Sequence, residues 1–140
     1  MIKKFFIIFV TFFSFYGLVK ADNSLNSDFS ETQDIIKSQI LAFQNKDAEL
    51  AFSYAAPIIK FKFNNPEEFM TMVKEYYEPV YNPKQYYFIE SKYFEGSIYH
   101  QLQIISQSNQ SYLATYSLIK KDNEWKISGC AVIPMRQESI

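Results

Sequence analysis

The chain has 140 residues, of which 48% are hydrophobic and 19% aromatic, and its formal net charge is −1 at pH 7. This length suits one domain with a hydrophobic core. The charge and the scattered lysines argue against nucleic-acid binding, which depends on clustered Lys and Arg at the phosphates. The single cysteine, Cys130, excludes an internal disulfide, so burial must hold the fold together.

The first 21 residues have the layout of a cleavable secretory signal. Lys3 and Lys4 precede an uncharged run from Phe5 to Val19, and Val19-Lys20-Ala21 fits a signal peptidase site. The alternative is an uncleaved anchor, but as a helix the run rises only about 22 Å, less than the ~30 Å hydrocarbon core. We therefore predict cleavage after Ala21, a periplasmic or secreted protein, and no membrane span in the mature chain.

The first helix of the mature domain is predicted to begin at Ser30. Residues 22–29 are polar and are expected to form a disordered linker. Ser30 and Gln33 have the spacing of a capping box at a helix N-terminus. The buried stripe of this helix is expected to consist of Ile36, Ile40 and Phe43.

Two further helices are predicted before the β region. Asp47 is expected to cap a short second helix that Pro57 ends, and Asn65 with Pro66 marks the start of a third. A loop is expected over residues 79–83, between two prolines. Helix residues expected to face the sheet include Tyr54, Phe69, Met72, Val73 and Tyr76.

From Gln85 onward, alternating hydrophobicity and polar turn sequences predict four strands. The strands are expected at Tyr86–Lys92, Ser97–Ser106, Ser111–Lys120 and Trp125–Ile133. Short connections make antiparallel neighbours. Helices followed by a meander predict an α+β fold, with the N-terminal helices packed on a curved antiparallel sheet. One domain is expected over residues 30–134, followed by a tail at 135–140.

Strand alternation predicts which side chains face the core. The expected inward residues are Ile98, His100, Leu102 and Ile104, then Tyr112, Ala114, Tyr116 and Leu118, then Trp125, Ile127, Gly129 and Ala131. A bulge at Gly129 would instead turn Cys130 inward. We predict that Trp125 and Ile127 are core residues and that Cys130 is unreactive.

Short motifs in one order resemble a known family. They are Gln39–Phe43, Ala51-Phe52, Ala56-Pro57, Pro79–Tyr81, Gln101, Tyr116 and Trp125–Cys130. This order, from about Ile35 to Val132, resembles a family of small exported bacterial proteins known as a domain of unknown function. More distantly, the chain resembles the ketosteroid-isomerase-like cone superfamily. The resemblance implies a cone-shaped fold and a periplasmic location, but the catalytic residues of the isomerase have no counterpart here.

Four polar side chains on expected inward faces are the candidate ligand-binding residues: Gln39, His100, Tyr112 and Tyr116. Buried polar groups need partners, which a ligand in the cone or a neighbouring protein group can supply. His100 is a weak catalytic candidate, because an imidazole titrates near neutral pH. The alternative for His100 is a hydrogen-bonded core histidine, and for Gln39 a structural tie. The acidic residues lack metal-ligand spacing, so no metal or cofactor is expected.

Three functions stay open from the sequence. The leading one is a non-enzymatic exported protein that binds a small apolar ligand or an envelope partner. The second is an isomerase- or hydratase-like enzyme that uses His100 in the cone. The third is an oligomeric scaffold, such as a homodimer, whose outer sheet face presents Tyr99, Leu113 and Ile119.

Overall fold

The computed structural model describes the backbone of residues 2–136 and the side chains of residues 23–136. It divides into two compact units, Met1–Glu31 and Thr32–Ile140. The side chain of Ala21 at the predicted cleavage site and residues 137–140 of the predicted tail lie outside these described parts. The division into signal, linker and domain therefore stays a prediction. Among the described residues, the helices include none that is long and apolar enough to cross a membrane.

The first helix, α1, extends over Ile2–Gln44 and does not begin at Ser30. Residues 22–29 are thus helical rather than disordered. They contain neither glycine nor proline, so nothing in this segment interrupts a helix that starts earlier. Gln33, expected in a capping box, instead donates from Nε2 to Ser91 Oγ at 3.3 Å.

Four short helices follow: α2 at Ala48–Ser53, α3 at Pro57–Lys60, α4 at Pro66–Tyr76 and α5 at Glu78–Tyr81. Both predicted caps are confirmed. Asp47 accepts a hydrogen bond from Leu50 N at 3.1 Å, and Asn65 accepts one from Glu68 N at 2.9 Å. The start of the predicted loop at 79–83 is helical, because α5 includes Pro79 in its first turn, where a missing N–H is tolerated.

The four predicted strands are confirmed as β1 at Gln85–Phe94, β2 at Ser97–Ile105, β3 at Ser111–Lys121 and β4 at Glu124–Pro134. They form one sheet in the order β1-β2-β3-β4, with every neighbouring pair antiparallel. The two-residue connections Glu95-Gly96 and Asp122-Asn123 have positive φ at both positions. That is the backbone of type I′ turns, whose twist matches that of paired strands.

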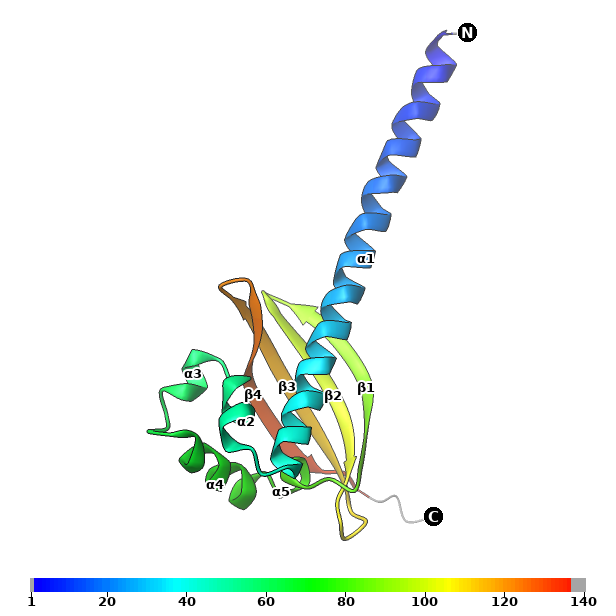
Figure 1. Ribbon diagram of the computed structural model, residues 1–140. Coiled ribbons are helices and arrows are strands. Elements are labelled where there is room, and N and C mark those ends of the chain that lie inside the picture. Colours follow the sequence, from blue (N-terminus) through cyan, green and yellow to red (C-terminus); the bar gives the residue numbers. More distant parts are fainter. Residues whose placement is uncertain (1, 137–140) are drawn as a thin grey trace. The chain divides into compact units, whose positions relative to one another are not determined.

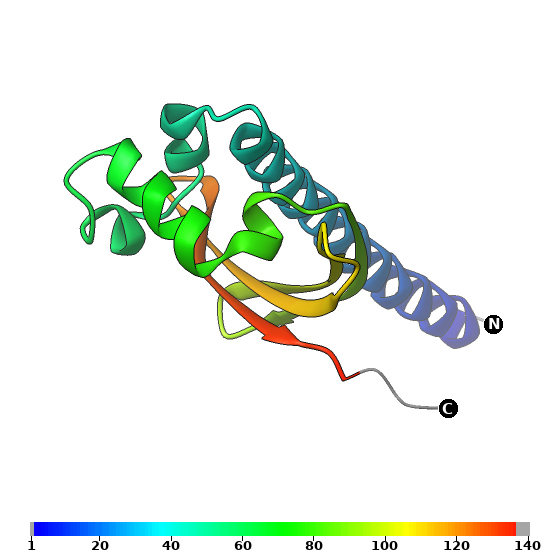
Figure 2. The same cartoon turned by 90° about the horizontal axis from the view of Figure 1, so that it is seen from below.

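The helices of the Thr32–Ile140 unit cover one face of the sheet, which confirms the predicted α+β fold (Figure 1). Seen from below, the green helices and the cyan end of α1 lie on the same side of the strands (Figure 2). The sheet is open, with β1 and β4 as its edges. The more specific cone shape stays a prediction.

The core follows the predicted alternation through β2 and most of β3. Ile98, Leu102, Ile104 and Leu118 are fully buried, and the predicted α1 stripe and the two predicted core residues of β4 are buried as well: Ile36, Ile40, Phe43, Trp125 and Ile127. This large apolar area removed from water supplies most of the favourable folding free energy.

The face assignment of β4 changes at a bulge. Leu118 pairs with Ile127 and Ser117 pairs with Gly129, so Ser128 is an extra residue. After this extra residue the alternation is inverted. The prediction that Gly129 and Ala131 face inward is therefore wrong, and Cys130, which pairs with buried Tyr116, turns inward as the bulge alternative predicted.

Two helix tyrosines do not lie where the sequence pattern placed them. Tyr54 is half-buried in the turn after α2, and Tyr76 is 76% exposed at the end of α4. Phe69 and Val73 are buried as predicted. The short α4 buries only the middle of its apolar stripe, because the chain turns away into α5 directly after Tyr76.

The connection between α2 and α3 covers part of the β4 edge. Ala55 forms a parallel bridge with Ile127. Ala56 N donates to Ile127 O at 2.7 Å, and Ile127 N donates to Tyr54 O at 2.9 Å. Both backbone groups of Ile127 are thereby paired outside the β3–β4 ladder, which joins the helical layer to the sheet beside the bulge.

Candidate functional site

A cavity of about 410 Å³ lies between the α3–α5 helices, the end of α1 and the inner faces of β3 and β4. Helical residues supply the largest share of its wall: Gln39, Phe43, Ile59, Phe69, Met72, Val73 and Val80. The strands add Tyr116 and Ile127–Cys130, and connecting segments add Lys62, Phe63 and Tyr77. Its size lies in the range typical of small-molecule sites.

Aromatic rings form a connected part of the apolar wall. Phe69 lies at the centre, with ring centroids 6.2 Å from Phe43 and 5.5 Å from Phe63. Phe52 packs behind Phe69, with centroids 5.2 Å apart. Such tilted and edge-on pairs are favourable and hold the rings in place. The cavity is therefore bounded by side chains that pack on one another.

Tyr116 presents the buried polar group of this cavity. Its side chain is only 1% exposed, and its hydroxyl has no well-formed hydrogen bond among the described residues. Burial raises the pKa of Tyr116 well above its usual value, and the neighbouring Cys130 thiol adds a smaller effect. The phenol thus stays protonated at neutral pH and keeps its donor hydrogen.

Gln39 also lines the cavity, but its amide has a structural partner. Its Nε2 donates to the backbone oxygen of Ala51 at 3.1 Å, and the residue is 3% exposed. This bond ties α1 to α2, which is a structural tie of the kind named as the alternative for Gln39.

His100 does not line this cavity, although it lies directly opposite Tyr116 in the β2–β3 pair. Thr32 Oγ1 lies 2.7 Å from Nε2, and Ser91 Oγ lies 2.7 Å from Nδ1. The residue is fully buried, and its ring meets Phe88 edge to face at 5.7 Å. Burial lowers the pKa of His100 to about 4. His100 is therefore a neutral core histidine at pH 7, with hydroxyl groups at both ring nitrogens.

Tyr112 is likewise outside the cavity. It is half-buried, and its hydroxyl donates to Gln110 Oε1 at 3.2 Å in the β2–β3 connection. Of the four residues expected to share one pocket, Gln39 and Tyr116 do so and His100 and Tyr112 do not. Alternation predicts which face of the sheet a side chain is on. It does not predict where along the strand the helices leave a space, so it could not distinguish the residues that line the cavity from those that do not.

The family model for the domain of unknown function DUF4864 matches residues 25–140 of this chain. The chain belongs to the DUF4864 family. The resemblance to a domain-of-unknown-function family is thereby confirmed, whereas the more distant relationship to the ketosteroid-isomerase-like superfamily stays a prediction. A comparison with curated proteins finds no match.

The bulge of this DUF4864 domain places Cys130 at the cavity beside Tyr116. Burial raises the pKa of the Cys130 thiol to about 12, and the interaction with Tyr116 lowers it only slightly. A thiol with such a pKa carries almost no thiolate at neutral pH, and the thiolate is the reactive form.

We therefore expect Cys130 to be labelled slowly in the native protein. With a thiol-reactive disulfide reagent at pH 8, the native rate should be at least about 100-fold below the rate in urea, since both thiolate formation and access are reduced. Comparing the two rates on one preparation is the measurement. Equal rates in the two conditions would show that the thiol is exposed or activated.

Sequence reasoning missed the helical side of the site. Lys62, Phe63 and Met72 line the cavity, yet in the sequence they belong to a short apolar stretch and an ordinary helix stripe. The one feature of the sequence that could have indicated a site there is the cluster of aromatic residues around Asn65. Within the described residues, no group of three or more His, Cys, Asp and Glu side chains could hold a metal ion.

Proposed function

We propose that this DUF4864 protein is an exported binding protein whose cavity holds a small, mainly apolar molecule with an oxygen acceptor. The Lys3-Lys4 leader and the Val-x-Ala sequence support export. The cavity supports binding, because aromatic and aliphatic walls with few polar groups are typical of small-molecule sites.

The observation that carries the proposal is the Tyr116 hydroxyl. It is buried, it has no well-formed hydrogen bond among the described residues, and Tyr116 lines an apolar cavity beside the Cys130 thiol. Leaving such a group without a partner costs about 1–3 kcal/mol. A bound carbonyl, ether or hydroxyl oxygen would remove that cost, so the site favours a ligand that carries one of these groups.

The isomerase- or hydratase-like alternative gains less support from this arrangement. Its candidate, His100, is enclosed between Thr32 and Ser91 and does not line the cavity. A general acid or base must reach the proton that it transfers. The scaffold alternative rests on the outer sheet face, where Tyr99 is 36% exposed while Leu113 and Ile119 are half-buried.

The test is native mass spectrometry of protein purified from its own host. The expected result is a mature chain that begins at Asp22, with an additional small mass that is lost on gentle activation. An intact chain that begins at residue 1 or 2 would contradict export. A mature chain with only its own mass, from several preparations, would contradict retention of a ligand.

Tyr116→Phe should abolish ligand retention while the free energy of unfolding of the ligand-free domain stays unchanged or rises by about 1 kcal/mol, because the buried hydroxyl that is removed has no well-formed hydrogen bond. Tyr112→Phe is the matched control, since it removes a hydroxyl that lies outside the cavity. Urea titration followed by circular dichroism measures both variants. A loss above about 1 kcal/mol in Tyr116→Phe would mean that the hydroxyl has a structural partner.

A further inference from the structure

The rim of the cavity carries a positive charge, which belongs to Lys62. Lys62 is exposed to solvent and is the charged residue of the lining, which contains no Asp or Glu. The remaining lining is apolar, aromatic or neutral polar. We propose, on the basis of the proposed function, that the ligand is an amphipathic anion: its negative group lies beside Lys62, and its apolar body extends toward Tyr116.

Lys62 is available for such a group. The ion pairs of the described residues join Lys37 to Asp34 and Lys126 to Glu124, and neither includes Lys62. The neighbouring Lys60 lies over the ring of Phe52, 5.6 Å from its centroid. Among the described residues, Lys62 thus differs from Lys60 in having neither a carboxylate nor an aromatic ring as a partner.

Glu68, an acidic residue close to Lys62 in the sequence, is hydrogen-bonded to Asn64 and not to Lys62. Glu68 accepts hydrogen bonds from Asn64 N at 3.0 Å and from Asn64 Nδ2 at 3.2 Å. These bonds lower the pKa of Glu68 and keep its carboxylate at the start of α4. An external anion therefore does not compete with an existing Lys62–Glu68 pair.

The deep end of the cavity excludes the opposite orientation. Tyr116 and Gln39 are neutral, and the aromatic cluster around Phe69 surrounds the space with apolar surface. A carboxylate placed there would lose its hydration without gaining a cation, which is strongly unfavourable. The anion must therefore stay at the solvent-exposed rim, while a neutral oxygen on the ligand can accept from Tyr116.

Two probes of the same chain length, one with a charged end and one with a neutral end, test this orientation. The ω-hydroxydecanoate anion has a carboxylate at one end and a hydroxyl at the other, whereas decanediol has hydroxyls at both ends. We expect NMR titrations of the mature protein at low salt to give a dissociation constant about two- to fivefold lower for ω-hydroxydecanoate than for decanediol, the range typical of an exposed ion pair. Added salt should remove this preference.

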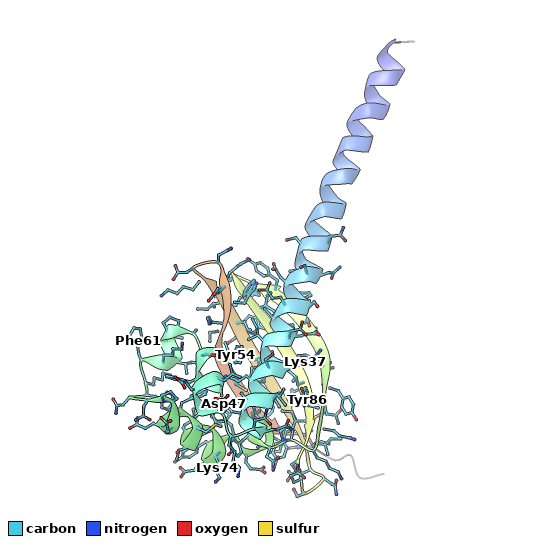
Figure 3. All side chains as sticks on the ribbon, viewed as in Figure 1. Lys37, Asp47, Tyr54, Phe61, Lys74 and Tyr86 are labelled. Carbon is cyan, nitrogen blue, oxygen red and sulfur yellow. The ribbon has the colours of Figure 1, made fainter. Side chains whose placement is uncertain are left out.

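Lys62→Gln should bind both probes equally, and Lys74→Gln should retain the preference of the wild type. Lys74 is a matched control because it is an exposed lysine on α4 that lies outside the cavity lining (Figure 3). Equal binding of both probes to the wild type, or a preference that survives Lys62→Gln, would overturn the anion assignment while leaving the binding function intact. If neither probe shifts the resonances of Gln39, Tyr116 or Cys130, the proposed function itself fails.

Discussion

Trp125→Ala should lower the free energy of unfolding by about 3–5 kcal/mol, the usual cost of removing a buried Trp side chain. Trp125 is 5% exposed at the start of β4, and it shares its inward face with Ile127. The substitution removes this buried area and leaves a void that the packed sheet cannot fill completely. A domain with typical stability of about 5–15 kcal/mol would lose a large part of it.

Urea titration followed by far-ultraviolet circular dichroism gives this free energy, because the variant lacks the only tryptophan of the chain. Phe61→Ala is the control: Phe61 is 88% exposed and projects from the α3 side of the domain, so we expect a change within about 0.5 kcal/mol (Figure 3). If Trp125→Ala does not fold, Trp125→Phe should still show a smaller loss. A loss below about 1 kcal/mol in Trp125→Ala would contradict its position in the core.

Acidification from pH 7 to pH 4 should destabilise the domain through His100 by about 2–3 kcal/mol. Burial lowers the folded-state pKa to about 4, below the ordinary value of 6.5. As the pH falls below 6.5, His100 becomes protonated in the unfolded chain but stays neutral in the folded domain. The stabilising contribution of His100 is therefore complete above about pH 6.5 and is lost progressively down to about pH 4.

The chain contains one histidine, so a single imidazole resonance reports this titration by NMR. The midpoint should lie near pH 4 in the native protein. His100→Gln, whose amide can also bond to Thr32 and Ser91, should show a smaller decrease in unfolding free energy between pH 6.5 and pH 4 than the wild type. A native midpoint near 6.5, or the same pH dependence in both proteins, would mean that His100 is solvated.

Local sequence signals predicted the elements well because local chemistry determines them. Asp47 and Asn65 cap α2 and α4 as predicted, and the Glu95-Gly96 and Asp122-Asn123 turns separate the strands. The extent of α1 was not predictable in this way. A capping pattern at Ser30 predicts where a helix can begin, but it does not end a helix that already enters from the preceding residues.

The candidate site was predicted only in part because it depends on long-range geometry. Alternation placed Tyr116 inward, and the helix stripe placed Gln39 inward, and both line the cavity. The same patterns could not show that Thr32 and Ser91, far apart in sequence, would surround His100. These patterns also could not show that Lys62 would lie at the rim of the cavity, because its position depends on how α3 and α4 pack.

The bridge between Ala55 and Ile127 has a consequence for self-association. An unpaired strand edge is a template on which a second chain can add. Because the segment after α2 already occupies both backbone groups of Ile127, a foreign strand cannot pair with β4 there. On β4, strand addition would have to begin beyond the Ser128 bulge, where the local twist is increased and a long regular ladder is disfavoured. The same contact that attaches the helices to the sheet thus protects this edge from polymerisation.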